Sequence, residues 1–138
     1  GVSDAQALQQ SDAICTALQL ANFWQDLSVD IPRGRHYLPR ADCAAYGACQ
    51  AELLARQTTP QNARLIQDSA DWARALMVQG APLVHSLPGR MGWELRLVVQ
   101  GGLRILDKVD ALQGGSLHTR PRLHAPDWIV MLARAVAM

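Results

Sequence analysis

Residues 19–30 read QLANFWQDLSVD and combine an apolar helical pattern with a row of polar side chains. Asn22, Asp26 and Asp30 are spaced four residues apart, and residues at i, i+4 and i+8 lie along one face of an α-helix. Gln19 falls on the same face, three residues before Asn22. The other positions of the run are mostly apolar, which predicts a helix that is largely buried.

The two carboxylates of this row need a positive partner. Buried carboxylates are nearly always paired or bound to a metal, and two of them one helical turn apart repel each other. Mg²⁺ is the natural candidate because it prefers oxygen ligands and often shares its coordination shell with substrate phosphates. We therefore expect a Mg²⁺ site at Asp26 and Asp30; the alternative is a solvated acidic edge of an amphipathic helix.

The residues that follow the row are basic and aromatic. Residues 31–39 read IPRGRHYLP and place Arg33, Arg35 and Tyr37 just beyond the second carboxylate. The guanidinium group recognises phosphate through a planar fork of donors. Carboxylates that bind a metal beside arginines indicate a site for a diphosphate.

The whole stretch QLANFWQDLSVDIPRGRHYLP, residues 19–39, resembles the second aspartate-rich motif of the squalene/phytoene synthase family. These enzymes join isoprenoid diphosphates head to head. The turn LPGR at 87–90, the helix expected over 93–107 and the segment RPRL at 120–123 with Asp127 and Trp128 resemble the hopanoid-pathway (hydroxysqualene synthase) branch. The resemblance extends over nearly the whole chain from about Ser11 onward.

The resemblance implies an all-α helical bundle of the isoprenoid synthase type and Mg²⁺ as cofactor. Asp26 and Asp30 match the metal-binding aspartates, and Asn22 matches the amide ligand of the metal. Arg35 and Tyr37 match residues near the diphosphate and the reacting carbons. Gln19 and Arg120 match further substrate-binding positions.

Two departures from the family pattern stand out. Many family members carry Arg immediately before the first aspartate, where this chain has Gln25, which removes one expected phosphate contact. The family also has a first DxxxD motif facing the second, and the sequence contains only the one at Asp26 and Asp30. We therefore expect residues 1–138 to be the C-terminal half of such an enzyme and to be inactive in isolation.

The implied activity is the Mg²⁺-assisted ionisation of presqualene or farnesyl diphosphate, giving hydroxysqualene- or squalene-type triterpene precursors. Head-to-head condensation of the phytoene or dehydrosqualene synthase type is the alternative within the class. A non-catalytic helical interaction fragment is the alternative from another class. Expected partners are a prenyl diphosphate, the missing N-terminal half or a second copy of the chain, and a membrane contacted peripherally through the lipid product.

Composition agrees with a helical protein that does not bind nucleic acid. The net charge is +1 among 138 residues, without a basic stripe. No apolar run is long enough to span a bilayer. Cys15, Cys43 and Cys49 match no zinc spacing and indicate reduced thiols, so we expect a cytoplasmic or membrane-associated protein.

Helix start and stop signals predict five helices and no strand. The first runs from residue 3 or 11 to residue 30, before Pro32, and the others cover 39–45, 60–79, 89–112 and 126–137, with Gly80 as a C-terminal signal. Gly101 and Gly102 lie inside the fourth helix, where they either allow close helix approach, leave room for a prenyl chain, or are a tolerated weak point. Arg90, Glu94 and Arg96 are expected to form a surface ion pair.

Overall fold

The computed structural model of the chain is all-α. It describes residues 4–35, 40–48 and 50–138, and these contain no strand. The α-helices of the described residues are α1 (Ala5–Gln25), α2 (Leu27–Asp30), α3 (Arg40–Ala45), α4 (Gln50–Leu54), α5 (Pro60–Gly80), α6 (Gly89–Ala111) and α7 (Ala125–Ala137). Short 3-10 turns cover Ile31–Arg33, Ala81–His85 and Gly115–Leu117.

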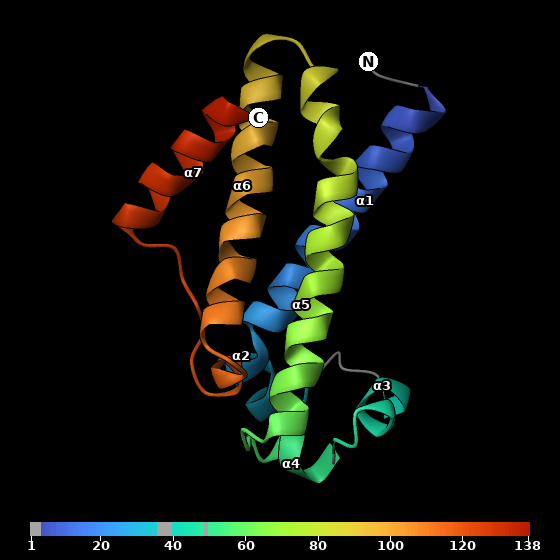
Figure 1. Cartoon of the computed structure of the whole chain (residues 1–138), viewed down its shortest axis with the longest axis vertical. Coiled ribbons are helices and arrows are strands. Elements are labelled where there is room, and N and C mark those ends of the chain that lie inside the picture. Colours follow the sequence, from blue (N-terminus) through green and yellow to red (C-terminus); the bar gives the residue numbers. More distant parts are fainter. Residues whose placement is uncertain (1–3, 36–39, 49) are drawn as a thin grey trace.

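Three long helices form the body of the molecule. Helices α1 and α5 pack against each other, and both contact α6, while α7 lies on the outer side of α6 (Figure 1). The short helices α2, α3 and α4 gather at the end of the bundle that lies away from the two termini (Figure 1). One long face of α1 therefore lies beside α6.

Small residues let the axes of α1 and α5 come close together. The buried positions of α1 include Ala13, Ala17 and Ala21, and those of α5 include Ala70 and Ala73. At the far end of α5, a Cβ atom on Gly80 would lie 2.5 Å from the carbonyl oxygen of Gln10 and 2.6 Å from Cγ1 of Ile14. Helix α5 ends at Gly80 as predicted, but Gly80 has a right-handed φ of −83°. Gly80 therefore allows α5 to approach α1 closely and does not cap the helix in a left-handed conformation.

The aspartate-rich row does not lie on one continuous helix, so that prediction is wrong. Helix α1 ends at Gln25, and Asp26 has φ −97° and ψ 8°, outside the helical range, before α2 begins at Leu27. The Asp26 N–H still donates to the Asn22 carbonyl (2.9 Å), and the Asp30 N–H donates to the Asp26 carbonyl (2.8 Å). The chain thus keeps its approximate course through the bend, and Asp30 sits on a separate turn.

The other predicted helices are confirmed within a few residues, and one short helix was missed. Helices α5, α6 and α7 match the ranges 60–79, 89–112 and 126–137. Helix α3 begins at Arg40, and Pro39 lies outside the described residues. Helix α4 was not predicted, because its five residues are too few to show a periodic pattern.

The surface pair predicted on α6 forms only in part. Arg90 Nε lies 2.6 Å from Glu94 Oε1, and both side chains are exposed, so the pair contributes little to stability. Arg96 donates instead to the carbonyl oxygens of Ala135 (3.0 Å) and Met138 (2.8 Å). Its guanidinium also lies over the Trp93 ring, 5.3 Å from the centroid. Arg96 therefore holds the last turn of α7 against α6.

The structure tests in part the expectations about the cysteines and about membrane-spanning helices. Cys15 and Cys43 are free thiols, and Cys49 lies outside the described residues. Burial, together with the nearby Asp42 carboxylate, raises the pKa of the Cys43 thiol. In the described part of the chain no helix has the length and apolar character needed to cross a membrane.

Asp127 joins α7 to α6 through a buried carboxylate. It accepts from Lys108 Nζ (2.8 Å), from the main-chain N–H of His124 (2.7 Å) and from Arg104 Nε (2.8 Å). These donors, Lys108 first, hold the pKa of Asp127 far below its usual range, although burial opposes them. The ionised form is therefore the one that the folded chain stabilises.

A pH dependence of stability follows from this lowered pKa. The contribution of Asp127 should be complete above its unfolded pKa of about 3.9 and should be lost as the pH falls through its folded pKa. We expect the Tm difference between wild type and Asp127→Asn to be large at neutral pH and to narrow below about pH 4. Thermal unfolding from pH 7 to pH 2 measures it. A Tm difference between wild type and Asp127→Asn that stays constant over this range would contradict the assignment.

Candidate functional site

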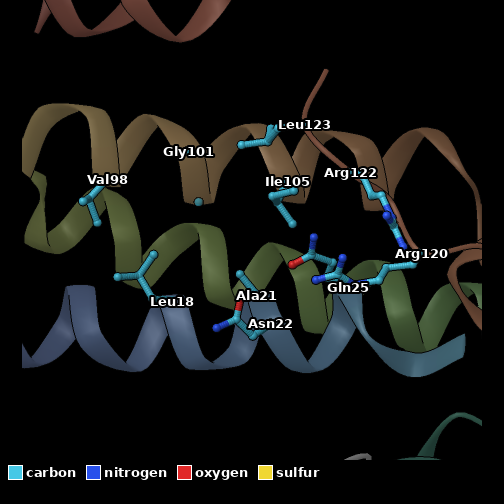
Figure 2. A pocket seen from close by; sticks show the side chains of 11 residues that line it. Leu18, Ala21, Asn22, Gln25, Val98, Gly101, Ile105, Arg120, Arg122 and Leu123 are labelled. Carbon is cyan, nitrogen blue, oxygen red and sulfur yellow. The ribbon is translucent and has the colours of Figure 1, made fainter. Parts of the chain in front are cut away.

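A cavity of about 390 Å³ lies between α1 and α6. Figure 2 shows that its two ends differ: Leu18 and Val98 lie at one end, and Gln25, Arg120 and Arg122 lie at the other. The cavity is thus an apolar trough with a polar, positively charged end. The residues that line it are Leu18, Ala21, Asn22, Gln25, Val98, Gly101, Gly102, Ile105, Arg120, Arg122 and Leu123.

The two glycines of α6 have different functions. A Cβ atom on Gly102 would lie 2.6 Å from Cε of Met77 and 3.1 Å from Cδ2 of Leu18, so Gly102 allows close packing against α5 and α1. A Cβ atom on Gly101 would meet only Cε of Met131, at 3.4 Å. Gly101 lines the cavity, and the interpretation that it leaves room for a prenyl chain stays a prediction.

An ion pair and a hydrogen bond join the end of α1 to residues close to the start of α7. Arg120 Nε lies 2.7 Å from Asp26 Oδ1, across a sequence separation of 94 residues. The neighbouring Gln25 donates from Nε2 to the carbonyl oxygen of Pro121 at 2.8 Å. The fold thereby brings the first aspartate of the motif to the polar end of the cavity.

The remaining predicted site residues are less closely tied to the polar end of the cavity than Asp26 is. Asn22 is exposed on α1 and lines the cavity, whereas Gln19 is exposed and is absent from its lining. Asp30 is half-buried, and among the described residues its carboxylate has no hydrogen-bond or ion-pair partner. Arg35 has an exposed side chain, and its main-chain N–H donates to the Asp30 carbonyl at 2.9 Å. Tyr37 lies outside the described residues.

Sequence reasoning missed Arg122. This residue is exposed, lines the polar end of the cavity beside Arg120, and has no ion-pair partner in the part of the chain that the structure describes. The segment RPR at 120–122 was available as a signal, since a proline between two arginines favours an extended chain that presents both of them.

The oxygen atoms of the predicted metal ligands suit a hard divalent cation. Asp26, Asp30 and Asn22 offer carboxylate and amide oxygens, and Arg120 contacts one oxygen of Asp26. Within residues 4–35, 40–48 and 50–138, no group of three or more His, Cys, Asp and Glu side chains forms a complete metal cage. Two carboxylates match Mg²⁺, which is usually bound through one or two carboxylates and completes its shell with water and substrate phosphates.

Comparison with known proteins agrees with this helical architecture. A crystal structure of squalene synthase HpnC from Alicyclobacillus acidocaldarius superposes with a TM-score of 0.76 at 37% sequence identity, over 85% of this chain and 43% of that one. The chain thus has the isoprenoid synthase helical fold. The sequence profile of the family described as Squalene/phytoene synthase matches residues 1–128. The chain belongs to the squalene/phytoene synthase family, as predicted.

Similar proteins include enzymes of two kinds. A phytoene synthase from Thermus thermophilus is 33% identical over 86% of this chain and 41% of its own length. A hydroxysqualene synthase from Sinorhizobium fredii is 30% identical over 93% of this chain and 43% of its own length. The chain therefore spans less than half the length of these relatives. That residues 1–138 are the C-terminal half stays a prediction.

Proposed function

We propose that this chain supplies one wall of a Mg²⁺-dependent site for a prenyl diphosphate. The whole protein would ionise farnesyl or presqualene diphosphate and form a hydroxysqualene- or squalene-type product. The observation that supports this proposal is the cavity that joins an apolar trough to Arg120 and Arg122, the first of which pairs with Asp26. The membership of the squalene/phytoene synthase family supports the same class of reaction.

The polar end would bind the diphosphate. Arg120 and Arg122 present guanidinium groups there, and such groups form forked hydrogen bonds to phosphate oxygens. They add positive charge where the departing diphosphate gains negative charge, which stabilises the transition state. Asp26, Asp30 and Asn22 would hold Mg²⁺, which when bound supplies Lewis-acid neutralisation of the leaving group. Arg35 would add further positive charge beside Asp30.

The apolar trough would receive the prenyl chain. Leu18, Ala21, Val98 and Ile105 line it, and Gly101 leaves it wide beside the α6 main chain. Its volume of about 390 Å³ lies within the usual range for small-molecule sites. Apolar walls exclude water, so they would protect a carbocation formed after ionisation from unselective capture.

Binding of a non-ionisable analogue tests the proposal directly. We expect the chain to bind farnesyl thiolodiphosphate in isothermal titration calorimetry, and EDTA should weaken that binding strongly. Gly101→Leu should lower the affinity for the analogue at least about tenfold, because its side chain fills the trough, whereas affinity for inorganic diphosphate with Mg²⁺ should not change. Equal binding with and without Mg²⁺, or equal loss for both ligands in the variant, would contradict the proposed site.

A second candidate is condensation of the phytoene or dehydrosqualene type. The similarity to a phytoene synthase favours keeping it. The two candidates differ in the product: capture of the final cation by water gives an alcohol, hydride transfer from an added reductant gives a squalene-type hydrocarbon, and loss of a proton gives a hydrocarbon with one more double bond. Mass spectrometry of the products of the whole protein, supplied with farnesyl or geranylgeranyl diphosphate, separates them.

A further inference from the structure

The segment 119–124, here called the strap, separates two cavities. It connects the 3-10 turn Gly115–Leu117 to α7. On one side lies the cavity between α1 and α6, and on the other lies a second cavity of about 280 Å³ that Lys108 and His124 help to line. Arg120 and Arg122 line both cavities. The position of the strap therefore decides how much of each arginine faces the apolar trough.

One hydrogen bond from outside fixes the main chain in the middle of the strap. At its ends, the Thr119 N–H donates to the Gly115 carbonyl (2.9 Å), and the His124 N–H donates to Asp127 Oδ2 (2.7 Å). Between these ends, and within the described residues, the only main-chain group that is hydrogen-bonded is the Pro121 carbonyl, which accepts from Gln25 Nε2 at 2.8 Å. Proline has no N–H of its own with which to hold the strap.

The environment of Gln25 explains why a neutral donor suits this position. Gln25 is 8% exposed, so its amide works in a setting where a hydrogen bond is sheltered from water. Arg120 lies beside Gln25 and forms an ion pair with Asp26. Arg122 lies beyond Pro121 and has no ion-pair partner among the described residues. A third guanidinium at position 25 would add buried positive charge beside these two. The glutamine amide supplies the donor without that charge.

We propose that Gln25 is a positioning residue that anchors the strap, so that Arg120 and Arg122 face the trough together. This inference rests on the proposed function for its use in diphosphate binding, although the anchoring itself does not. It also changes the meaning of Gln25: the residue does not simply lack a phosphate contact, but acts through two other residues that make such contacts.

Limited proteolysis of the 138-residue chain tests the anchoring without any ligand. Trypsin cuts after Arg122 but not after Arg120, which precedes proline. We expect Gln25→Leu and Gln25→Glu to raise the initial rate of cleavage at Arg122–Leu123 about tenfold, the equivalent of about 1.4 kcal/mol, since neither side chain donates at neutral pH. Gln9→Leu, an exposed position on the same helix, should cleave at the wild-type rate.

Cleavage at Lys108–Val109, inside α6, serves as the internal reference for global unfolding. Faster cleavage at Arg122 alone supports the anchor. An unchanged cleavage rate at Arg122 would show that Gln25 does not hold the strap. A parallel increase at both bonds would show that Gln25 stabilises the fold as a whole. Either result overturns the proposed anchor.

Binding of inorganic diphosphate with Mg²⁺ tests the consequence for the site. Gln25→Leu should weaken binding about tenfold in the wild-type background and not at all when both Arg120→Ala and Arg122→Ala are present. Equal affinity for wild type and Gln25→Leu overturns the positioning role. If wild type itself does not bind diphosphate, the proposed function fails, and the proteolysis still decides whether Gln25 anchors the strap.

Discussion

Asp30→Ala is expected to lower the affinity of the chain for Mg²⁺-diphosphate at least about 100-fold. The change removes a carboxylate that has no partner among the described residues and that would be a direct metal ligand. Removing a residue that only hydrogen-bonds to a metal ligand typically costs about 10–100-fold in affinity for the metal, so loss of a ligand itself should cost at least as much. Calorimetry with inorganic diphosphate at saturating Mg²⁺ measures the change.

Two comparisons make this result specific. Asp12→Ala removes an exposed carboxylate from α1 and should leave the affinity unchanged. Asp26→Ala should lose as much affinity as Asp30→Ala and should also release Arg120, which makes the remaining binding more sensitive to salt. An Asp30→Ala protein that keeps its full Mg²⁺-dependent affinity would remove Asp30 from the metal site.

Gly80→Ala is expected to destabilise the fold by about 2 kcal/mol. The new methyl group would meet the Gln10 carbonyl oxygen at 2.5 Å and Ile14 Cγ1 at 2.6 Å. The first of these atoms belongs to the main chain of α1 and cannot turn aside as a side chain would. Relief therefore requires α1 and α5 to move apart, which loosens the packing of both. The midpoint of urea unfolding, followed by circular dichroism, measures the loss.

Gly101→Ala is the matched control on α6. Its methyl group would meet only the flexible end of Met131 at 3.4 Å, and alanine favours a helix over glycine by roughly 1 kcal/mol. We expect this variant to be as stable as wild type or more stable. If Gly80→Ala and Gly101→Ala unfolded at the same urea concentration, Gly80 would not be needed for the close approach of α1 and α5.

The long helices were predictable because each carries its own signals in the sequence. Pro60 and Gly89 mark helix starts, and long apolar periodic runs follow both of them. The break at Asp26 was not predictable, since α2 resumes almost in phase and leaves the spacing of Asn22, Asp26 and Asp30 unchanged. A sequence pattern shows how residues are spaced along the chain, whereas the helix break at Asp26 arises from the dihedral angles of that one residue.

Local pattern predicted the contiguous part of the site, and Arg120 was expected there only through the family resemblance. The motif around Asp26 and Asp30 is contiguous in sequence, and the family membership that it indicated is confirmed. The contact between Asp26 and Arg120 joins residues 94 positions apart, and it depends on the length of α6 and on the course of the strap. Arg122 and the anchoring bond of Gln25 depend on that same course, so no local pattern contains them.

The bend at Asp26 bears on which ions the site would accept. Donors on one straight helix keep a fixed separation, because the helical hydrogen bonds resist any change in it. Asp26 lies between α1 and α2, and only one short turn, closed by the Val29 and Asp30 N–H groups on the Asp26 carbonyl (2.9 and 2.8 Å), holds its carboxylate near that of Asp30, which is a less rigid link than a continuous helix. Oxygen ligands lie at about 2.0–2.1 Å from Mg²⁺ and at about 2.3–2.6 Å from Ca²⁺. We therefore expect weak discrimination by ionic radius, with selectivity arising from the water and phosphate ligands that complete the shell.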